Sequence, residues 1–227
     1  MNAKSGMARH GAFSTGYGAL GPDWVPGPDG IKFRRAARVI VLDDAAGRRA
    51  SRAYSSSQEA KDVVDERSEE HDAGRALLVR GHDADQPSRS WWFTVGGGID
   101  AGESDAEAAA RELAEETGLQ VAPGDLIGPV MTRTGLFHFF AETCRQAETF
   151  FVAYAPAGWQ PNRSGWTTAE TNLLDELAWF TPAELRAQPL EVFPAVLPDV
   201  IEQLAGGWTG VVVHLGEEDD DAGRAAS

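Results

Sequence analysis

The sequence contains a single cysteine, no long apolar run and no basic surplus, and each of these absences excludes a class of protein. Cys144 alone cannot form an internal disulfide or a zinc site built on several cysteines. No segment approaches the roughly 20 apolar residues that a membrane-spanning helix needs. The first residues lack the apolar core of a signal peptide. We therefore expect a cytoplasmic protein that works in a reducing compartment and does not bind a membrane.

An excess of acidic residues sets the electrostatics of the chain. Its 227 residues include 35 Asp and Glu but only 20 Lys and Arg, so the formal net charge is −15, and the isoelectric point is near 4.7. Such a surface repels a phosphate backbone, which argues against binding to a nucleic-acid duplex. An acidic protein that handles phosphate groups needs metal cations between its carboxylates and the phosphates.

Composition divides the chain into three parts. Residues 1–35 are rich in Gly and Pro and predict an extended N-terminal arm with little regular structure. Residues 36–205 carry the strand and helix signals. Within them, a polar insertion at about 45–74, with a short helix at about 58–70, predicts a mobile segment. Residues 206–227 form a C-terminal segment that ends in a solvated acidic tail.

Short apolar runs predict a sheet accompanied by a few helices. Helices are expected after the capping box that Thr181 forms with Glu184 and at about 194–204. This mixture of elements predicts an α/β fold of the sandwich type. The expected strands are Ala37–Leu42, Ala76–Arg80, Trp91–Val95, Leu136–Phe140, Glu148–Tyr154 and Leu177–Phe180.

A further helix is expected over residues 105–117. Ser104 and Glu107 form a capping box at its start. Gly118 suits the left-handed position that follows a helix C-terminus. One stripe of this helix contains small alanines and Leu113, so the helix can approach a sheet closely.

This helix also carries an unusual set of carboxylates. Glu112, Glu115 and Glu116 fall at positions i, i+3 and i+4, where like charges repel one another. Two of them lie near the C-terminus, where the helix dipole also disfavours anions. A divalent cation such as Mg²⁺ or Mn²⁺ would resolve the conflict, because these ions prefer hard oxygen ligands. The alternative is a solvated Glu-rich face paired with Arg111.

The residues around this helix complete a longer pattern that favours the metal. Its fixed positions are Gly97, Glu103, Arg111-Glu112-Leu113, Glu115-Glu116 and Gly118-Leu119, with gaps of five, seven, one and one residues. This pattern resembles the complete signature of the Nudix hydrolase family. The resemblance implies a mixed β-sheet sandwiched between α-helices. It also implies hydrolysis of a diphosphate linkage in a nucleoside diphosphate derivative, a small-molecule substrate, with Mg²⁺ or Mn²⁺ as cofactor.

The resemblance also assigns metal ligands. Glu115 and Glu116 would bind the ion, and the carbonyl oxygen of Gly96 would complete its coordination. Glu112 would be a ligand or the base that activates water. Glu103 would be a further ligand or would orient the arginine of the motif.

Some family members take an additional base or metal ligand from a later loop. Glu148 stands at the head of a predicted strand and is our first choice, although a plain strand-edge charge is an equal alternative. Glu170 is the second choice, and Asp175 and Glu176 are further candidates. Arg111 would hold the glutamates by ion pairing. The predicted catalytic residues are therefore Glu112, Glu115, Arg111 and Glu148.

Several other side chains have a structural and a functional interpretation. Alternation along a strand makes at least one of Trp91 and Trp92 a core residue. His138 is more typical of a structural histidine than of a proton shuttle. Cys144 is assigned no nucleophilic role. Sheet core is favoured over base stacking for Phe137, Phe139, Phe140, Phe150 and Phe151, and surface charge over phosphate binding for Arg80, Arg133 and Arg145.

Two functions remain open on the sequence alone. The first is a magnesium-dependent hydrolase, and the second is a module of the same fold that binds a nucleotide without turnover. The intact set of carboxylates favours the hydrolase, because a pure binder need not retain it. Many relatives are dimers, and a homodimer could exchange the N-terminal arm with Trp24 between its subunits.

Overall fold

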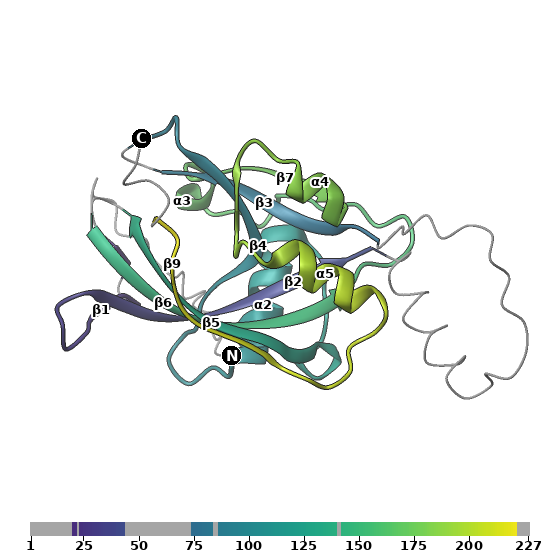
Figure 1. Cartoon of the computed structure of the whole chain (residues 1–227), viewed down its shortest axis with the longest axis horizontal. Coiled ribbons are helices and arrows are strands. Elements are labelled where there is room, and N and C mark those ends of the chain that lie inside the picture. Colours follow the sequence, from purple (N-terminus) through teal and green to yellow (C-terminus); the bar gives the residue numbers. More distant parts are fainter. Residues whose placement is uncertain (1–19, 22, 44–73, 84–85, 140–141, 222–227) are drawn as a thin grey trace, which may run out of the picture.

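The computed structural model describes residues 20–21, 23–43, 74–83, 86–139 and 142–221. This part contains a mixed nine-stranded sheet with a main strand order β7-β3-β4-β2-β6-β5-β9 (Figure 1). The strands are β1 (Val25–Pro26), β2 (Lys32–Leu42), β3 (Ala76–His82), β4 (Ser90–Gly98), β5 (Ile127–Phe139), β6 (Glu142–Tyr154), β7 (Leu174–Phe180), β8 (Glu191–Phe193) and β9 (Val213–Asp219). The helices are α2 (Asp105–Thr117), α3 (Thr168–Thr171), α4 (Pro182–Arg186) and α5 (Leu197–Ala205), with a 3₁₀ turn η1 at Pro123–Asp125.

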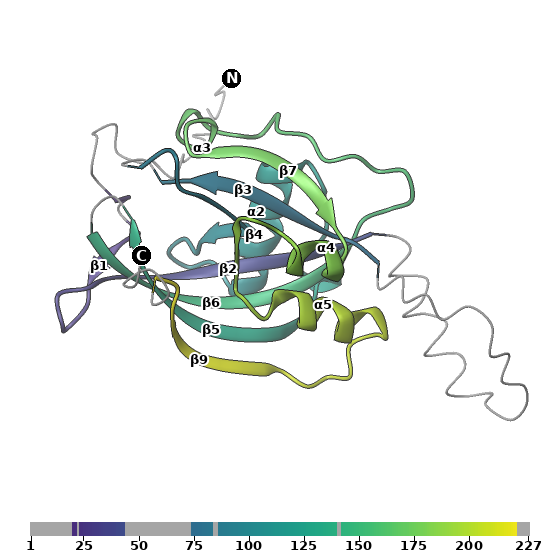
Figure 2. The same cartoon turned by 45° about the horizontal axis from the view of Figure 1, so that its top comes forward.

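Strand β2 lies near the centre of the sheet. It pairs in parallel with β6 along its whole length, from Lys32 opposite Cys144 to Leu42 opposite Tyr154. On its other side it pairs antiparallel with β4. Strand β5 forms a long antiparallel pair with β6, and β9 adds in parallel to the far edge of β5 (Figure 2).

Helices cover both faces of the sheet, as the sandwich prediction requires (Figures 1 and 2). Successive residues of β2 point to opposite faces. Val39 and Val41 belong to the core cluster under α2, whereas Ile40 and Leu42 belong to the cluster under α4 and α5. All four are fully buried. A strand buried on both faces needs an uninterrupted apolar run, which explains the sequence VIVL at residues 39–42.

The locally encoded elements match their predictions. Helix α2 spans the expected residues, and the capping boxes at Ser104 and Thr181 are both formed. The six expected strands are all present, and each of them is longer than predicted. Among the described residues, no helix is long and apolar enough to span a bilayer. The insertion with its short helix lies outside the described residues, except for Gly74.

At both chain ends, the described residues contain strands that the composition did not predict. The expected unstructured arm includes β1, and Lys32 to Arg35 already belong to β2. The expected solvated acidic tail contains β9 up to Asp219. Strand β1 pairs with the adjacent β2. The start of β2 and strand β9 pair with the distant strands β6 and β5, which local composition does not reveal. The division into arm, domain and C-terminal segment otherwise stays a prediction.

Candidate active site

Helix α2 is held with its glutamates towards a glycine-rich strand end. Its first turn is capped by Ser104, and it ends at Gly118, whose φ of 79° is left-handed. Ala108, Ala109 and Leu113 are fully buried against the sheet. The small alanines permit close packing of the helix on the sheet. This contact places the glutamate stripe beside the end of β4.

The glycines at the end of β4 make room for the carboxylates. Gly96 has a φ of 132°, and a Cβ atom there would lie 2.1 Å from the Ala37 carbonyl oxygen. A Cβ atom at Gly97 would lie 2.7 Å from the Glu112 carboxylate. The Gly96 amide donates a hydrogen bond of 2.9 Å to Glu116 Oε2. Only glycine fits such a close approach of backbone to side chain.

Arg111 orients the motif through several bonds at once. Its Nε and Nη2 donate to the two carboxylate oxygens of Glu103, each at 2.9 Å. Its Nη1 donates to Glu112 Oε1 at 2.7 Å, and its Nη2 also reaches the Gly98 carbonyl at 2.9 Å. The hydrogen bonds to Arg111 lower the pKa of Glu103. The bidentate pair brings Glu103 and Arg111 together, and the predicted role of Glu103 as a metal ligand stays a prediction.

Three carboxylates converge beside this arrangement. Glu112, Glu116 and Glu170 each offer one oxygen, and these oxygens lie within 4.8 Å of one another. Burial raises the pKa of Glu116 well above its ordinary value, and the charge of Glu112 raises that pKa further. Burial also raises the pKa of Glu112, against the opposing effect of Arg111. Buried anions that repel one another are costly unless a cation joins them, and hard carboxylate oxygens suit Mg²⁺.

Glu170, the second choice of the sequence analysis, reaches this cluster through a loop anchored on α2. The indole nitrogen of Trp166 donates to the Glu116 carbonyl oxygen at 2.8 Å. A Cβ atom at Gly165 would lie 2.3 Å from the Glu115 carbonyl oxygen, so the loop runs tightly over the helix end. Helix α3 then carries Glu170 over the other two glutamates.

Two other predicted metal ligands are not among the three converging carboxylates. The Glu115 side chain is half exposed and pairs with Arg111 at 3.3 Å. The Gly96 carbonyl oxygen accepts a hydrogen bond of 2.6 Å from Arg38 Nη1. Nothing in this geometry tests their roles as metal ligands, which stay predictions.

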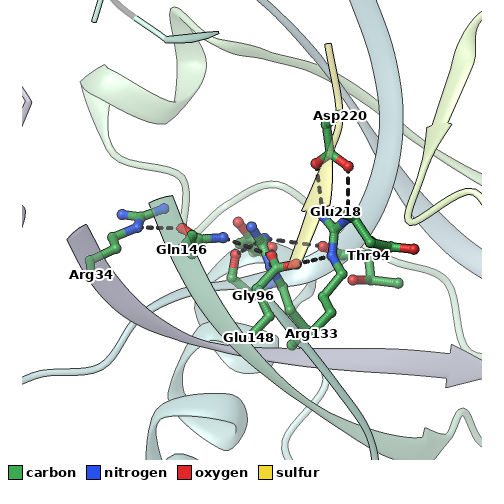
Figure 3. A network of polar contacts seen from close by, with 10 residues as sticks. Arg34, Thr94, Gly96, Arg133, Gln146, Glu148, Glu218 and Asp220 are labelled. Atoms are coloured by element: carbon green, nitrogen blue, oxygen red, sulfur yellow. Dashed lines mark hydrogen bonds and ion pairs between the residues drawn. The ribbon is translucent and has the colours of Figure 1, made fainter. Parts of the chain in front are cut away.

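Glu148, the first choice for a further base, is buried in an ion-pair network (Figure 3). Arg38 donates to one of its oxygens at 2.8 Å, and Arg133 donates to the other at 2.5 Å. Gln146 donates a third bond at 2.7 Å. Burial alone would raise the pKa of Glu148, but the two guanidinium charges outweigh it and lower the pKa to about 2. A carboxylate held this way is a weak proton acceptor.

A cavity of about 1060 Å³ connects the carboxylate cluster with this network. Its wall includes aromatic side chains, among them Trp24, Trp91 and Phe137. Trp92 is instead a core residue, so the prediction that one of the two neighbouring tryptophans is core is confirmed. Phe150 and Phe151 also belong to the core. The structure does not describe the side chains of Phe139 and Phe140.

The remaining residues that the sequence analysis considered as metal ligands or phosphate ligands form other ion pairs. Asp175 and Glu176 pair with Arg80, and Arg145 pairs with Asp29 and Glu217. Of the three arginines considered as phosphate ligands, Arg133 lines the cavity. Sequence reasoning did not find the contributions of Trp24, Arg38 and Asp220 to the cavity wall. No local motif marks them, because they lie in or directly beside strands that meet only in the folded sheet.

Comparison with known proteins gives a family match and more distant similarities. The sequence pattern of the NUDIX domain matches residues 63–201, well over half of the chain. An octanoyltransferase from Myxococcus xanthus is 53% identical over 53 residues, which are 23% of this chain, and the match spans 14% of that protein.

Solved structures with a similar fold include MutT proteins. A mutator MutT protein from Bacillus halodurans has a TM-score of 0.48 and 19% identity, covering 83% of this chain and 92% of that one. A MutT Nudix hydrolase from Burkholderia pseudomallei has a TM-score of 0.45 and 19% identity, covering 76% of this chain and 98% of that one. At these values the similarity carries no argument about function.

The helix, the glycine-rich strand end and the converging carboxylates together define an α/β sandwich protein with a candidate metal site at a large cavity. With the domain match spanning the complete motif, the chain belongs to the Nudix family.

Proposed function

We propose that this protein is a magnesium-dependent hydrolase that cleaves a diphosphate linkage in a nucleoside diphosphate derivative. The observation that carries the proposal is the convergence of Glu112, Glu116 and Glu170, with ligand oxygens within 4.8 Å of one another at the cavity wall. Membership of the Nudix family supports the same reaction class. The acidic net charge of −15 supports a bound cation, because the bare protein would repel a diphosphate.

The residues of the site have different proposed roles in binding a metal ion and in orienting its ligands. Glu112 and Glu116 would hold Mg²⁺ or Mn²⁺ from α2, and Glu170 would hold it from the opposite loop. When bound, the ion supplies Lewis-acid stabilisation of phosphate charge and lowers the pKa of a coordinated water. Arg111 orients the Glu112 carboxylate and ties it to Glu103. We keep Glu103, Glu115 and the Gly96 carbonyl as further proposed ligands.

A water molecule must lose its proton during the attack on phosphorus. Glu170 is partly buried at the cavity wall and is the carboxylate that approaches the cluster from outside the motif. We assign it as the first candidate for the proton acceptor, ahead of Glu148. Glu148 has both oxygens occupied by arginines, so it acts through Arg38 and Arg133 as a positioning residue.

A substrate screen with product analysis tests this proposal. Nucleoside diphosphate sugars, dinucleotides and nucleoside triphosphates are incubated with Mg²⁺, and the products are identified by mass. We expect release of a nucleoside monophosphate or of phosphate-containing products, abolished by EDTA and restored by Mg²⁺ or Mn²⁺. Measurable nucleotide binding without turnover on the whole panel would support the alternative, a binding module of the same fold.

A further inference from the structure

Among the described residues, every arginine that lines the cavity forms an ion pair. Arg34 pairs with Asp23 at 2.9 Å, and Arg111 pairs with Glu103 at 2.9 Å. The remaining pairs are Arg38 with Glu148 at 2.8 Å, Arg89 with Asp221 at 2.5 Å and Arg133 with Asp220 at 2.8 Å. The two histidines of the wall, His82 and His138, also contact aspartates. A phosphate group entering the cavity would therefore have to compete with a carboxylate for each of these side chains.

The C-terminal acidic segment supplies two of these carboxylates. Asp220 and Asp221 follow directly after β9, which pairs with β5. Asp220 lines the cavity, and Asp221 pairs with the wall residue Arg89. The Asp220 carboxylate accepts hydrogen bonds from both terminal nitrogens of Arg133, at 2.8 and 3.0 Å (Figure 3). This is the fork geometry that a phosphate uses on an arginine. Asp220 therefore occupies the position of a phosphate on Arg133.

The same guanidinium is already neutralised from other sides. Glu148 accepts from Arg133 Nε at 2.5 Å, and Glu218 contacts Arg133 Nη1 at 3.3 Å. Glu148 is shared with Arg38, so three carboxylates face the two guanidinium groups of Arg38 and Arg133. The Arg133 and Asp220 side chains are 5% and 11% exposed. A phosphate brought to this end of the cavity would meet net negative charge in a partly desolvated place, which is unfavourable.

The rest of this wall is built for an uncharged group. Trp24 and Phe137 pack edge to face with their centroids 6.1 Å apart, and both line the cavity. Arg34 stacks 4.4 Å over the Trp24 ring, and Arg89 lies 5.0 Å from the Trp91 ring centre. Rings and ion-paired guanidinium planes offer stacking area to a neutral or aromatic group without offering net charge.

We propose that Asp220 is a specificity-determining residue, which restricts the cavity to substrates whose group beyond the scissile diphosphate is uncharged. This inference rests on the proposed function, because it assumes that the diphosphate sits at the glutamate cluster. The metal ion at the glutamate cluster then balances the charge of the diphosphate. At the other end of the cavity, the Asp220 carboxylate repels an additional phosphate.

The decisive comparison uses two substrates with the same nucleoside. One is the nucleoside diphosphate linked to a hexose, and the other is the nucleoside triphosphate, which carries a third phosphate in place of the sugar. We expect the wild-type protein to favour the sugar derivative in kcat/KM. Asp220→Asn keeps the side-chain volume and removes the charge. We expect it to raise the ratio of triphosphate to sugar derivative about tenfold, the effect of one charge-assisted bond.

The control variant is Glu217→Gln. Glu217 lies on β9, three residues before Asp220. Its replacement removes the same charge, but Glu217 pairs with Arg145 outside the cavity wall at 2.8 Å. It should leave the substrate ratio at the wild-type value. An equal rise in both variants would overturn the proposal, because it would show that net charge alone, and not the contact with Arg133, sets the preference.

A binding measurement separates this inference from the proposed function. Calorimetry with Mg²⁺ compares pyrophosphate with tripolyphosphate, and neither measurement requires turnover. The wild-type protein should bind tripolyphosphate no more tightly than pyrophosphate, and Asp220→Asn should bind it several-fold more tightly. If no substrate is turned over, the proposed function fails while these affinities still decide the inference. If Asp220→Asn does not fold, a wild-type preference for tripolyphosphate or the triphosphate contradicts the inference by itself.

Discussion

At the scale of single residues, the site contains two kinds of buried carboxylate. One kind is ion-paired with arginines, and the other lies beside further carboxylates. Glu148 is buried and paired, and its pKa is lowered to about 2 by two arginines. Glu116 is equally buried, but its neighbours include Glu112, so burial and repulsion raise its pKa. The contrast separates a structural carboxylate from one that is suited to a cation. Two predictions follow from it, one for each residue.

Replacing Glu116 tests the metal assignment. Glu116→Gln keeps the volume and removes one of the repelling charges, so the unfolding temperature should stay unchanged or rise. Turnover should fall by orders of magnitude, because a proposed metal ligand is lost. Steady-state kinetics and thermal unfolding check the two expectations. Glu191→Gln, an exposed change on β8, is the matched control and should alter neither. Normal turnover by Glu116→Gln would contradict the assignment.

Glu148 should make the protein sensitive to acid. Its pKa in the folded state is about 2, below the ordinary value of 4.5. The folded state therefore binds fewer protons than the unfolded chain between these values, and the stability that Glu148 contributes is lost as the pH falls from about 4.5 to about 2. Chemical denaturation at pH 7, 4 and 3 should show this loss. In Glu148→Gln the decline should be shallower and the stability at pH 7 lower, because Arg38 and Arg133 lose their partner.

At the scale of elements, the site depends on the contact between α2 and the end of β4. The helix supplies the glutamates, and the strand end supplies glycines that the carboxylates approach closely. A side chain at Gly97 cannot coexist with Glu112 in its present position. The loop that carries Glu170 depends on α2 in the same way, through Trp166.

Gly97→Ala is expected to displace Glu112 without unfolding the protein. Its Cβ atom would lie 2.7 Å from a carboxylate at the end of a side chain, which can move aside. Turnover should fall about a hundredfold, the cost of a small misplacement at a reacting centre. Gly124→Ala is the control, because a Cβ atom there meets no other atom within 4 Å. Equal activities of the two variants would show that Glu112 need not hold this position.

At the scale of the whole molecule, a strongly acidic chain is expected to gain stability from divalent cations. Mg²⁺ that binds only the folded protein stabilises it by about 2.7 kcal/mol at one hundred times its dissociation constant. Thermal unfolding with increasing Mg²⁺ should therefore show a rising midpoint, reversed by EDTA. The Glu116→Gln variant should lose most of this rise, which distinguishes the site from general screening of 35 acidic residues. An unchanged rise in that variant would argue against a site at α2.

The sequence by itself determined the elements whose signals are local. The capping box, the alanine stripe and Gly118 define α2 within a few residues, and the spacing of the motif identifies the family. The apolar run VIVL, residues 39–42, defines the buried part of β2 because every residue in it faces one of the two cores. In these cases the physical cause of the structure lies in residues that are close in sequence, so the sequence pattern was enough to predict the element.

The tertiary structure alone decided which distant residues share the cavity. Glu170 joins the glutamates of α2 because a tight loop runs over the helix end, and β9 carries Asp220 to Arg133 because it pairs with β5. The acidic run at the end of the chain has the composition of a solvated tail. It contributes to the cavity wall only because β9 pairs with β5 and so brings Asp220 within reach of Arg133. Pairing between strands about 80 residues apart depends on the assembled sheet, and no local pattern encodes it.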